Sequence, residues 1–134
     1  MIYLNPNTTN QRFVVTLKEK WKDFDETPES YLLELRNVLN AETYYVIPIV
    51  ITDNERYTQL QIETDNDDPE NGEIELTETG EYSYTIYGQT GTTNIDPNDT
   101  DVIGVFEIGT CRVADIALSE YVDNETIPNT FIDQ

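Results

Sequence analysis

Residues 72–87, GEIELTETGEYSYTIY, contain two runs in which every second residue is apolar. In the second run, Tyr82, Tyr84 and Ile86 alternate with glutamate, serine and threonine. Strict alternation with a period of two is typical of β-strands that have one buried face and one face in water. The three residues 78–80 between the runs end in glycine, which predicts a hairpin connection. This stretch therefore predicts an antiparallel β fold.

Similar runs lie on both sides of this stretch. The runs that we expect to form strands are 2–4, 12–17, 31–38, 43–52, 57–63, 73–77, 81–87 and 102–113. Pro48 lies inside the run 43–52, and because proline cannot donate a ladder hydrogen bond, this strand is expected at a sheet edge or with a bulge. Residues 19–30 are expected to be a charged loop with exposed Trp21 and Phe24. Frequent turn signals and the lack of a long helical pattern favour an all-β fold, a two-sheet antiparallel β-sandwich (Ig-like or Greek-key) of about seven to eight strands.

The run 102–113 differs from the others because both of its faces are apolar. Such a strand either lies in the middle of the sandwich or meets another chain. Residues 114–134 lose the alternation but keep large apolar side chains, so we expect a β-sandwich domain over 1–113 and an extended C-terminal arm over 114–134. This arm would pack on its own sandwich or on a neighbouring subunit. The expected interface residues are Val102, Ile103, Val105, Ile116, Leu118, Tyr121, Ile127 and Phe131.

The net charge of −20 is unevenly distributed. Residues 1–56 carry six basic and nine acidic side chains, whereas residues 57–134 carry one basic and 18 acidic side chains. A surface this negative repels phosphate, so no nucleic-acid partner is expected. The acidic half could contact a basic partner, bind divalent cations or keep the protein soluble, and we favour solubility. The less acidic N-terminal third, with Lys18, Lys20, Lys22 and Arg36, is the better candidate for docking on acidic protein.

The chain has no histidine and a single cysteine, Cys111. Histidine is the commonest general base at neutral pH and a common metal ligand, so its absence argues against catalytic triads, zinc sites and haem sites. We expect no enzyme activity and no cofactor, although a hydrolase that uses only carboxylates stays open. Cys111 is expected to be a small buried apolar side chain. No apolar run approaches membrane-spanning length, so no membrane partner is expected.

Two acidic loops are candidates for cation sites. Asp65, Asp67, Asp68 and Glu70 supply the hard oxygen ligands that Ca²⁺ prefers. Their spacing does not fit a calcium-binding loop, because Glu70 stands where that loop needs glycine, so a solvated turn is favoured. Residues 94–101 form the second loop, in which Asn and Asp side chains are expected to bond their own backbone around a turn.

Several motifs resemble one family of proteins. The motifs are the tyrosine-alternating strand 80–89, the TTNIDP loop at 92–97 and the apolar strand that ends in IGTCRV at 108–113. Shorter likenesses are MIYLNPNTTN at 1–10, TLKE at 16–19 and NERY at 54–57. Over residues 1–113 the chain resembles the small β-sandwich virion structural proteins of tailed phages that infect Bacteroidetes, crAss-like phages included.

This resemblance implies a non-enzymatic virion protein that is assembled in the host bacterial cytoplasm. It implies a head-surface location, as a capsid-decorating protein or the base of a head fibre, with self-association as a dimer and docking on the capsid or other virion proteins. The alternative is a tail- or fibre-associated module that binds carbohydrate or calcium.

Overall fold

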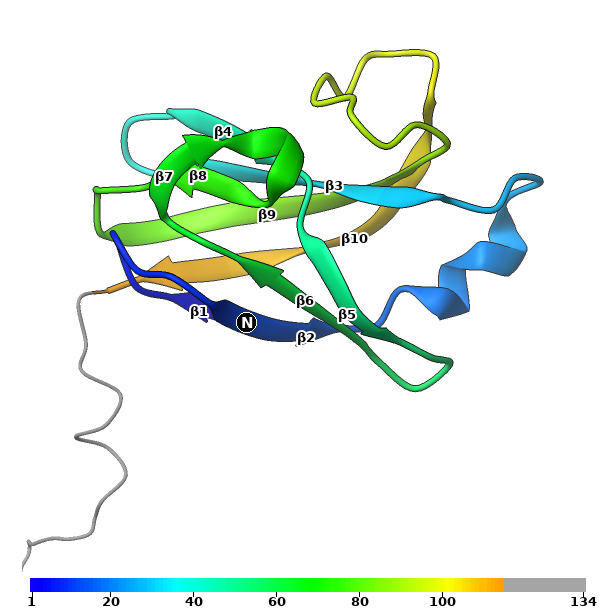
Figure 1. Cartoon of the computed structure of the whole chain (residues 1–134), viewed down its shortest axis with the longest axis horizontal. Coiled ribbons are helices and arrows are strands. Elements are labelled where there is room, and N and C mark those ends of the chain that lie inside the picture. Colours follow the sequence, from blue (N-terminus) through cyan, green and yellow to red (C-terminus); the bar gives the residue numbers. More distant parts are fainter. Residues whose placement is uncertain (115–134) are drawn as a thin grey trace, which may run out of the picture.

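The computed structural model describes residues 1–114 as an all-β fold (Figure 1). Residues 115–134, which cover most of the expected arm, lie outside the described residues. The elements are β1 (Ile2–Leu4), β2 (Gln11–Val15), η1 (Lys18–Asp23), β3 (Ser30–Asn37), β4 (Thr43–Val46), β5 (Ile49–Asp53), β6 (Thr58–Ile62), β7 (Asp65–Asp68), η2 (Pro69–Asn71), β8 (Glu73–Glu75), β9 (Gly80–Gln89) and β10 (Val102–Val113). No helix among residues 1–114 is long and apolar enough to cross a membrane.

The strands form two main sheets and one small sheet. The larger sheet has the order β1-β10-β9-β3-β4, the second has the order β2-β6-β5, and β7 pairs with β8. The main sheets lie on opposite sides of the domain (Figure 1). All pairs are antiparallel except β1 with β10, which is parallel. The predicted β-sandwich is therefore confirmed, with more strands than expected.

The core lies between the sheets and follows the predicted alternation. Tyr82, Tyr84 and Ile86 of β9 are buried, as are Phe13 and Val15 of β2. Alternate side chains of β2, β6 and β9 join one apolar cluster, to which β1, β3, β4, β8 and β10 also contribute. Burial of these side chains is the main favourable contribution to folding.

The run 43–52 does not form one strand as predicted. It splits at Ile47 and Pro48, where the chain leaves β4 in the larger sheet and enters β5 in the second sheet. Because Pro48 has no N–H to donate, the ladder ends there. The expected edge position is confirmed, since β4 and β5 each lie at an edge of their sheet.

The predicted hairpin through residues 78–80 is wrong. β8 pairs with β7, whereas β9 pairs with β3 and β10, so residues 76–79 carry the chain from the small sheet to the larger one. The first acidic loop, which holds Asp65 and Glu70, is also not a plain loop, because its residues form β7 and η2. Gly72 ends η2 with φ of 84°, a conformation that favours glycine.

The expectation of exposed aromatic side chains in residues 19–30 is also wrong. Residues 18–23 form η1, and Trp21 and Phe24 pack against the core. The ring of Phe24 stacks on that of Phe106, with 4.8 Å between centroids. This stacking needs Gly104, because a Cβ at that position would lie 2.6 Å from the Phe24 ring.

Candidate interaction surface

The outer face of β10 exposes two large apolar side chains. Val105 is 42% exposed and Ile108 is 70% exposed. Irregularities in the pairing with β9 lie between Val102 and Gly104 and between Val105 and Glu107. A bulge of this kind shifts the alternation, which lets Phe106 be buried while Val105 and Ile108 face solvent.

One edge of β10 is open along most of the strand. β1 pairs only with residues 111–113, so within residues 1–114 the stretch 102–110 has a strand partner on the β9 side alone. An open edge beside exposed apolar side chains is a surface on which another chain can add a strand. We call the outer face and open edge of residues 102–110 the β10 surface.

The Glu107 side chain links β10 to the end of β2 and to β9. Its Oε1 accepts the backbone N–H of Thr16 at 3.3 Å, and the Tyr84 hydroxyl donates to its Oε2. Burial raises the pKa of Tyr84, and the bond to the Glu107 carboxylate adds to this. Since Glu107 is bonded to residues near both main sheets, it has a structural role in holding β10 in place.

A second apolar strip lies on the edge strand β5. Ile49, Val50 and Ile51 are each exposed by more than a third, and the pairing with β6 is irregular between Val50 and Thr52. No predicted interface residue lies in this strip. The signal for it was Pro48, which indicated an edge strand within a run of branched apolar residues.

The expected interface residues differ in where they lie. Val105 is exposed, Val102 is half-buried, and Ile103 packs against the core. Ile108 was part of the two-sided apolar run but not of the expected interface, although it is the most exposed apolar side chain of β10. The remaining expected interface residues lie outside the described residues: Ile116, Leu118, Tyr121, Ile127 and Phe131.

The acidic candidates for calcium are not gathered into a metal site. Asp65, Asp67 and Asp68 lie in β7 and Glu70 lies in η2. Asp68 Oδ2 accepts a hydrogen bond from Asn71 Nδ2 at 2.9 Å. In the part of the chain that the structure describes, no group of three or more His, Cys, Asp or Glu side chains could hold a metal ion.

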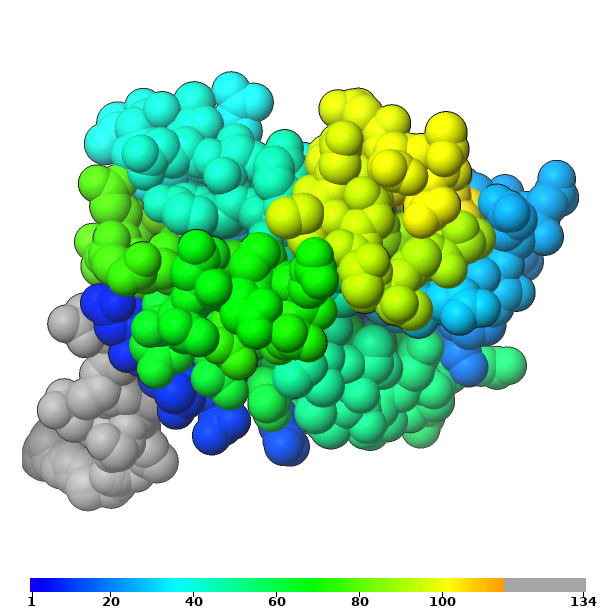
Figure 2. All heavy atoms as spheres, turned by 45° about the horizontal axis from the view of Figure 1, so that its top comes forward, coloured from blue at the N-terminus to red at the C-terminus, as the bar shows by residue number. Residues whose placement is uncertain are grey.

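The loop between β9 and β10 is held by its own polar side chains, as predicted. Asn94 Oδ1 accepts the N–H of Asp96 at 3.0 Å, and Asp96 Oδ1 accepts the N–H of Asn98 at 2.9 Å. Gln89 is fully buried and donates to the Asn94 carbonyl oxygen at 3.0 Å, which fastens the loop to β9. The loop (yellow) projects beyond the strands in Figure 1 and lies on the near face of the molecule in Figure 2.

The lysines expected to form a docking face lie on η1 among acidic side chains. Lys18 Nζ lies 4.7 Å from the centroid of the Trp21 ring, and Lys20 lies 4.0 Å from Asp23. Both side chains of the Lys20–Asp23 pair are more than half exposed, and an exposed pair at this distance contributes little. The docking of this face on an acidic partner stays a prediction.

Comparison with known proteins gives no relative. No family model, curated protein or solved structure matches the chain.

Proposed function

We propose that this chain is a non-enzymatic structural subunit of a bacteriophage particle. In this role it sits on the head surface, as a capsid-decorating protein or head-fibre base, self-associates as a dimer and docks on the capsid. The sequence motifs described above support the phage assignment. The observation that carries self-association is the β10 surface, where Val105 and Ile108 are exposed beside an open strand edge.

The chemistry of the described residues favours binding over catalysis. The sequence holds no histidine, and Glu107 already accepts hydrogen bonds from Thr16 and Tyr84. Tyrosine side chains can form sugar-binding surfaces, but Tyr82 and Tyr84 lie in the core and cannot contact a sugar. No observation favours the alternative adhesion role over the structural one.

Self-association is tested with Ile108→Lys in the full chain. Placing a charge in an apolar interface should convert the dimer to a monomer, because the buried ammonium would lack a partner. Val14→Lys is the matched control, since Val14 is 57% exposed on β2 of the other sheet. Sedimentation should give a dimer for the unsubstituted chain and for V14K, and a monomer for I108K. A monomeric unsubstituted chain, or a dimeric I108K, would refute the assignment of the interface.

Location in the particle is tested by cryo-electron microscopy of the phage from which the chain comes. Density for this domain in pairs on the head shell is the expected result. Density confined to the tail or its fibres would contradict the head-surface role and support the adhesion role.

A further inference from the structure

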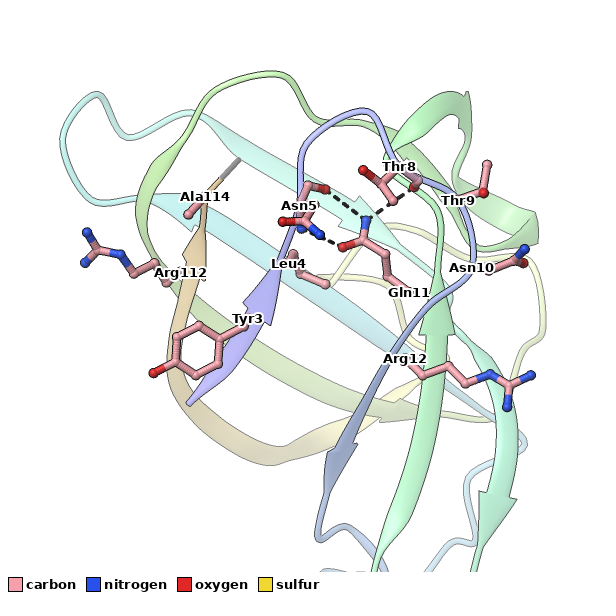
Figure 3. A pocket seen from close by; sticks show the side chains of 10 residues that line it. All are labelled: Tyr3, Leu4, Asn5, Thr8, Thr9, Asn10, Gln11, Arg12, Arg112 and Ala114. Atoms are coloured by element: carbon pink, nitrogen blue, oxygen red, sulfur yellow. Dashed lines mark hydrogen bonds between the residues drawn. The ribbon is translucent and has the colours of Figure 1, made fainter. Parts of the chain in front are cut away.

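A groove of about 520 Å³ lies between β1, β2 and the end of β10 (Figure 3). Ala114, the last residue that the structure describes, is part of its lining. β1 is the edge of the larger sheet and β2 is an edge of the second sheet. Tyr3, Leu4, Gln11, Arg12, Arg112 and Ala114 are among its lining residues. The groove therefore lies at the open side of the sandwich, between two sheet edges that are not paired with each other.

The backbone of β1 offers hydrogen-bonding groups to this groove. The Leu4 carbonyl oxygen accepts the N–H of Ala114 at 3.0 Å, so the backbone N–H and C=O of Leu4 point towards β10. Backbone groups alternate along a strand, which directs the N–H and C=O of Tyr3 and Asn5 to the other edge. At Asn5 the side chain of Gln11 meets both groups, accepting from the N–H and donating to the C=O at 2.9 Å (Figure 3). The backbone N–H and C=O of Tyr3 lie on this same edge of β1 and point towards the groove.

The segment that follows Ala114 has the composition to fill this groove. Residues 115–122, DIALSEYV, include Ile116 and Leu118, and residues 115–134 carry five acidic side chains and no basic one. Arg12 and Arg112 line the groove, and Arg112 is the sole basic residue after Arg56. In a chain of net charge −20, the groove is thus a place where basic side chains can meet an acidic, apolar segment.

The distance is also suitable for the same chain. Passing from the position of β10 across β1 covers two strand spacings, about 10 Å. Ala114 already lines the groove, and three extended residues span about 10 Å. Residues 115–117, with Ile116, can therefore cross the groove past the end of β1, and residues 118–122 can lie along its open edge. A segment from a second copy has no such connection.

We infer that residues 115–122 bind in the groove between β1 and β2 of their own chain. Ile116 and Leu118 pack against the groove, the backbone adds to the open edge at Tyr3, and the acidic side chains lie near Arg12 and Arg112. This inference does not depend on the proposed role in a phage particle. Its failure would leave the Ile108→Lys test unaffected.

The test is amide hydrogen exchange measured by NMR on the full chain. Ile116→Asp/Leu118→Asp should speed exchange of the Tyr3 amide at least tenfold, because the segment would leave the groove and expose this donor. Ile127→Asp/Phe131→Asp is the matched control and should leave that amide unchanged. The amides of β3 and β9 report whether the fold is intact and should not change in either variant.

Dilution and a second variant distinguish binding within one chain from binding between two copies and from misfolding. Exchange of the Tyr3 amide should be the same at protein concentrations that differ a hundredfold, and a loss of protection on dilution would place a second copy in the groove and overturn the inference. Arg12→Ala/Arg112→Ala should also speed this exchange, by weakening the attraction of the acidic segment. Unchanged exchange in I116D/L118D, or in this arginine variant if the first fails to fold, would refute the inference.

Discussion

Three glycines determine where aromatic rings lie in the core. A Cβ on Gly88 would lie 2.5 Å from the Phe106 ring, and one on Gly109 would lie 2.6 Å from the Tyr84 ring. Together with Gly104 beneath Phe24, these positions let large rings lie directly on the strands. Glycine costs backbone entropy in a strand, so its use here is explained by the room that each ring needs.

Gly109→Ala should destabilise the domain by about 1–3 kcal/mol. The new methyl group would push against the ring of Tyr84, which is buried and donates to Glu107, so the ring cannot move without straining that bond. Urea unfolding measures the change. Thr110→Ala, at the exposed neighbouring position, is the control and should change stability by less than about 0.5 kcal/mol. Equal stability of the two variants would contradict this account.

Cys111 should not react with thiol reagents in the folded protein. It is fully buried in β10, as its sequence context predicted, and burial raises the pKa of its thiol to about 12. The reactive thiolate is therefore scarce at pH 8, at a fraction of about 10⁻⁴. A reagent that releases a coloured thiol when it reacts with cysteine should give an absorbance change only after urea unfolds the protein. Thr110→Cys adds an exposed thiol next to Cys111, and this variant should react immediately, with one thiol per folded chain. Fast labelling of the unsubstituted folded chain would argue against this packing.

At the scale of elements, η1 works as a cover for one end of the sandwich. Trp21 Nε1 donates to the Tyr31 hydroxyl at 3.0 Å, and Phe24 stacks on Phe106. Tyr31 meets the same Phe106 ring edge-on, at 6.0 Å between centroids. The segment between β2 and β3 is thus held by aromatic contacts although its helix has only six residues.

Phe24→Ala should loosen this cover and lower the stability of the domain by about 2–4 kcal/mol. The substitution removes the stacked ring and uncovers Phe106, and the fluorescence of the single tryptophan, Trp21, should shift to longer wavelength as water reaches it. Phe24→Leu keeps most of the apolar volume and should cost less than half as much. A Trp21 spectrum that does not change in F24A would mean that η1 is held without Phe24.

The sequence predicted local patterns well and strand partners poorly. The alternation in β9 and the span of β10 follow from neighbouring residues, and both predictions are confirmed. The partner of β8 depends on residues 65–68, and the separation of β4 from β5 depends on which sheet each joins, so neither can be decided from a local run. Burial of Phe24 likewise depends on Gly104, far away in the chain.

The same limit applies to the candidate surface. Val105 was predicted from a run that is apolar on both faces, but the bulges that expose Ile108 and bury Phe106 arise from pairing with β9. The acidic residues 65–70 have the oxygen ligands that Ca²⁺ prefers, yet their placement in β7 and η2 does not assemble a metal site within the described residues. Composition indicates which ligands are present, and only the fold decides whether they converge.

At the scale of the whole molecule, buried tyrosines should make the protein sensitive to alkali. Burial raises the pKa of Tyr31 to about 12, with a further rise from Asp53, and burial also raises the pKa of Tyr84. Between pH 10 and 12 the unfolded chain therefore loses protons that the folded chain keeps, and stability falls as the pH rises. Each such tyrosine adds a slope of about 1.4 kcal/mol per pH unit.

Urea unfolding at pH 9, 10 and 11 measures this loss. The urea concentration at the unfolding midpoint should decrease as the pH rises above 10. Tyr84→Phe should make this decrease smaller because it removes one of the titrating groups. Below pH 9 these tyrosines should contribute no slope, since they are protonated in both states. A midpoint that holds steady up to pH 11 would exclude the proposed cause.

The parallel pairing of β1 with β10 has a consequence for the order in which the domain can be built during translation. Ile2 pairs with Cys111, so the first of the described strands to leave the ribosome has its sheet neighbour among the last described residues. Until β10 emerges, β1 has no partner and β9 lacks one of its two neighbours. A nascent chain that stops before residue 102 can therefore form only part of the larger sheet. Completion of the sandwich must wait for nearly the whole domain to be synthesised, which makes arrested nascent chains of increasing length a direct way to follow its assembly.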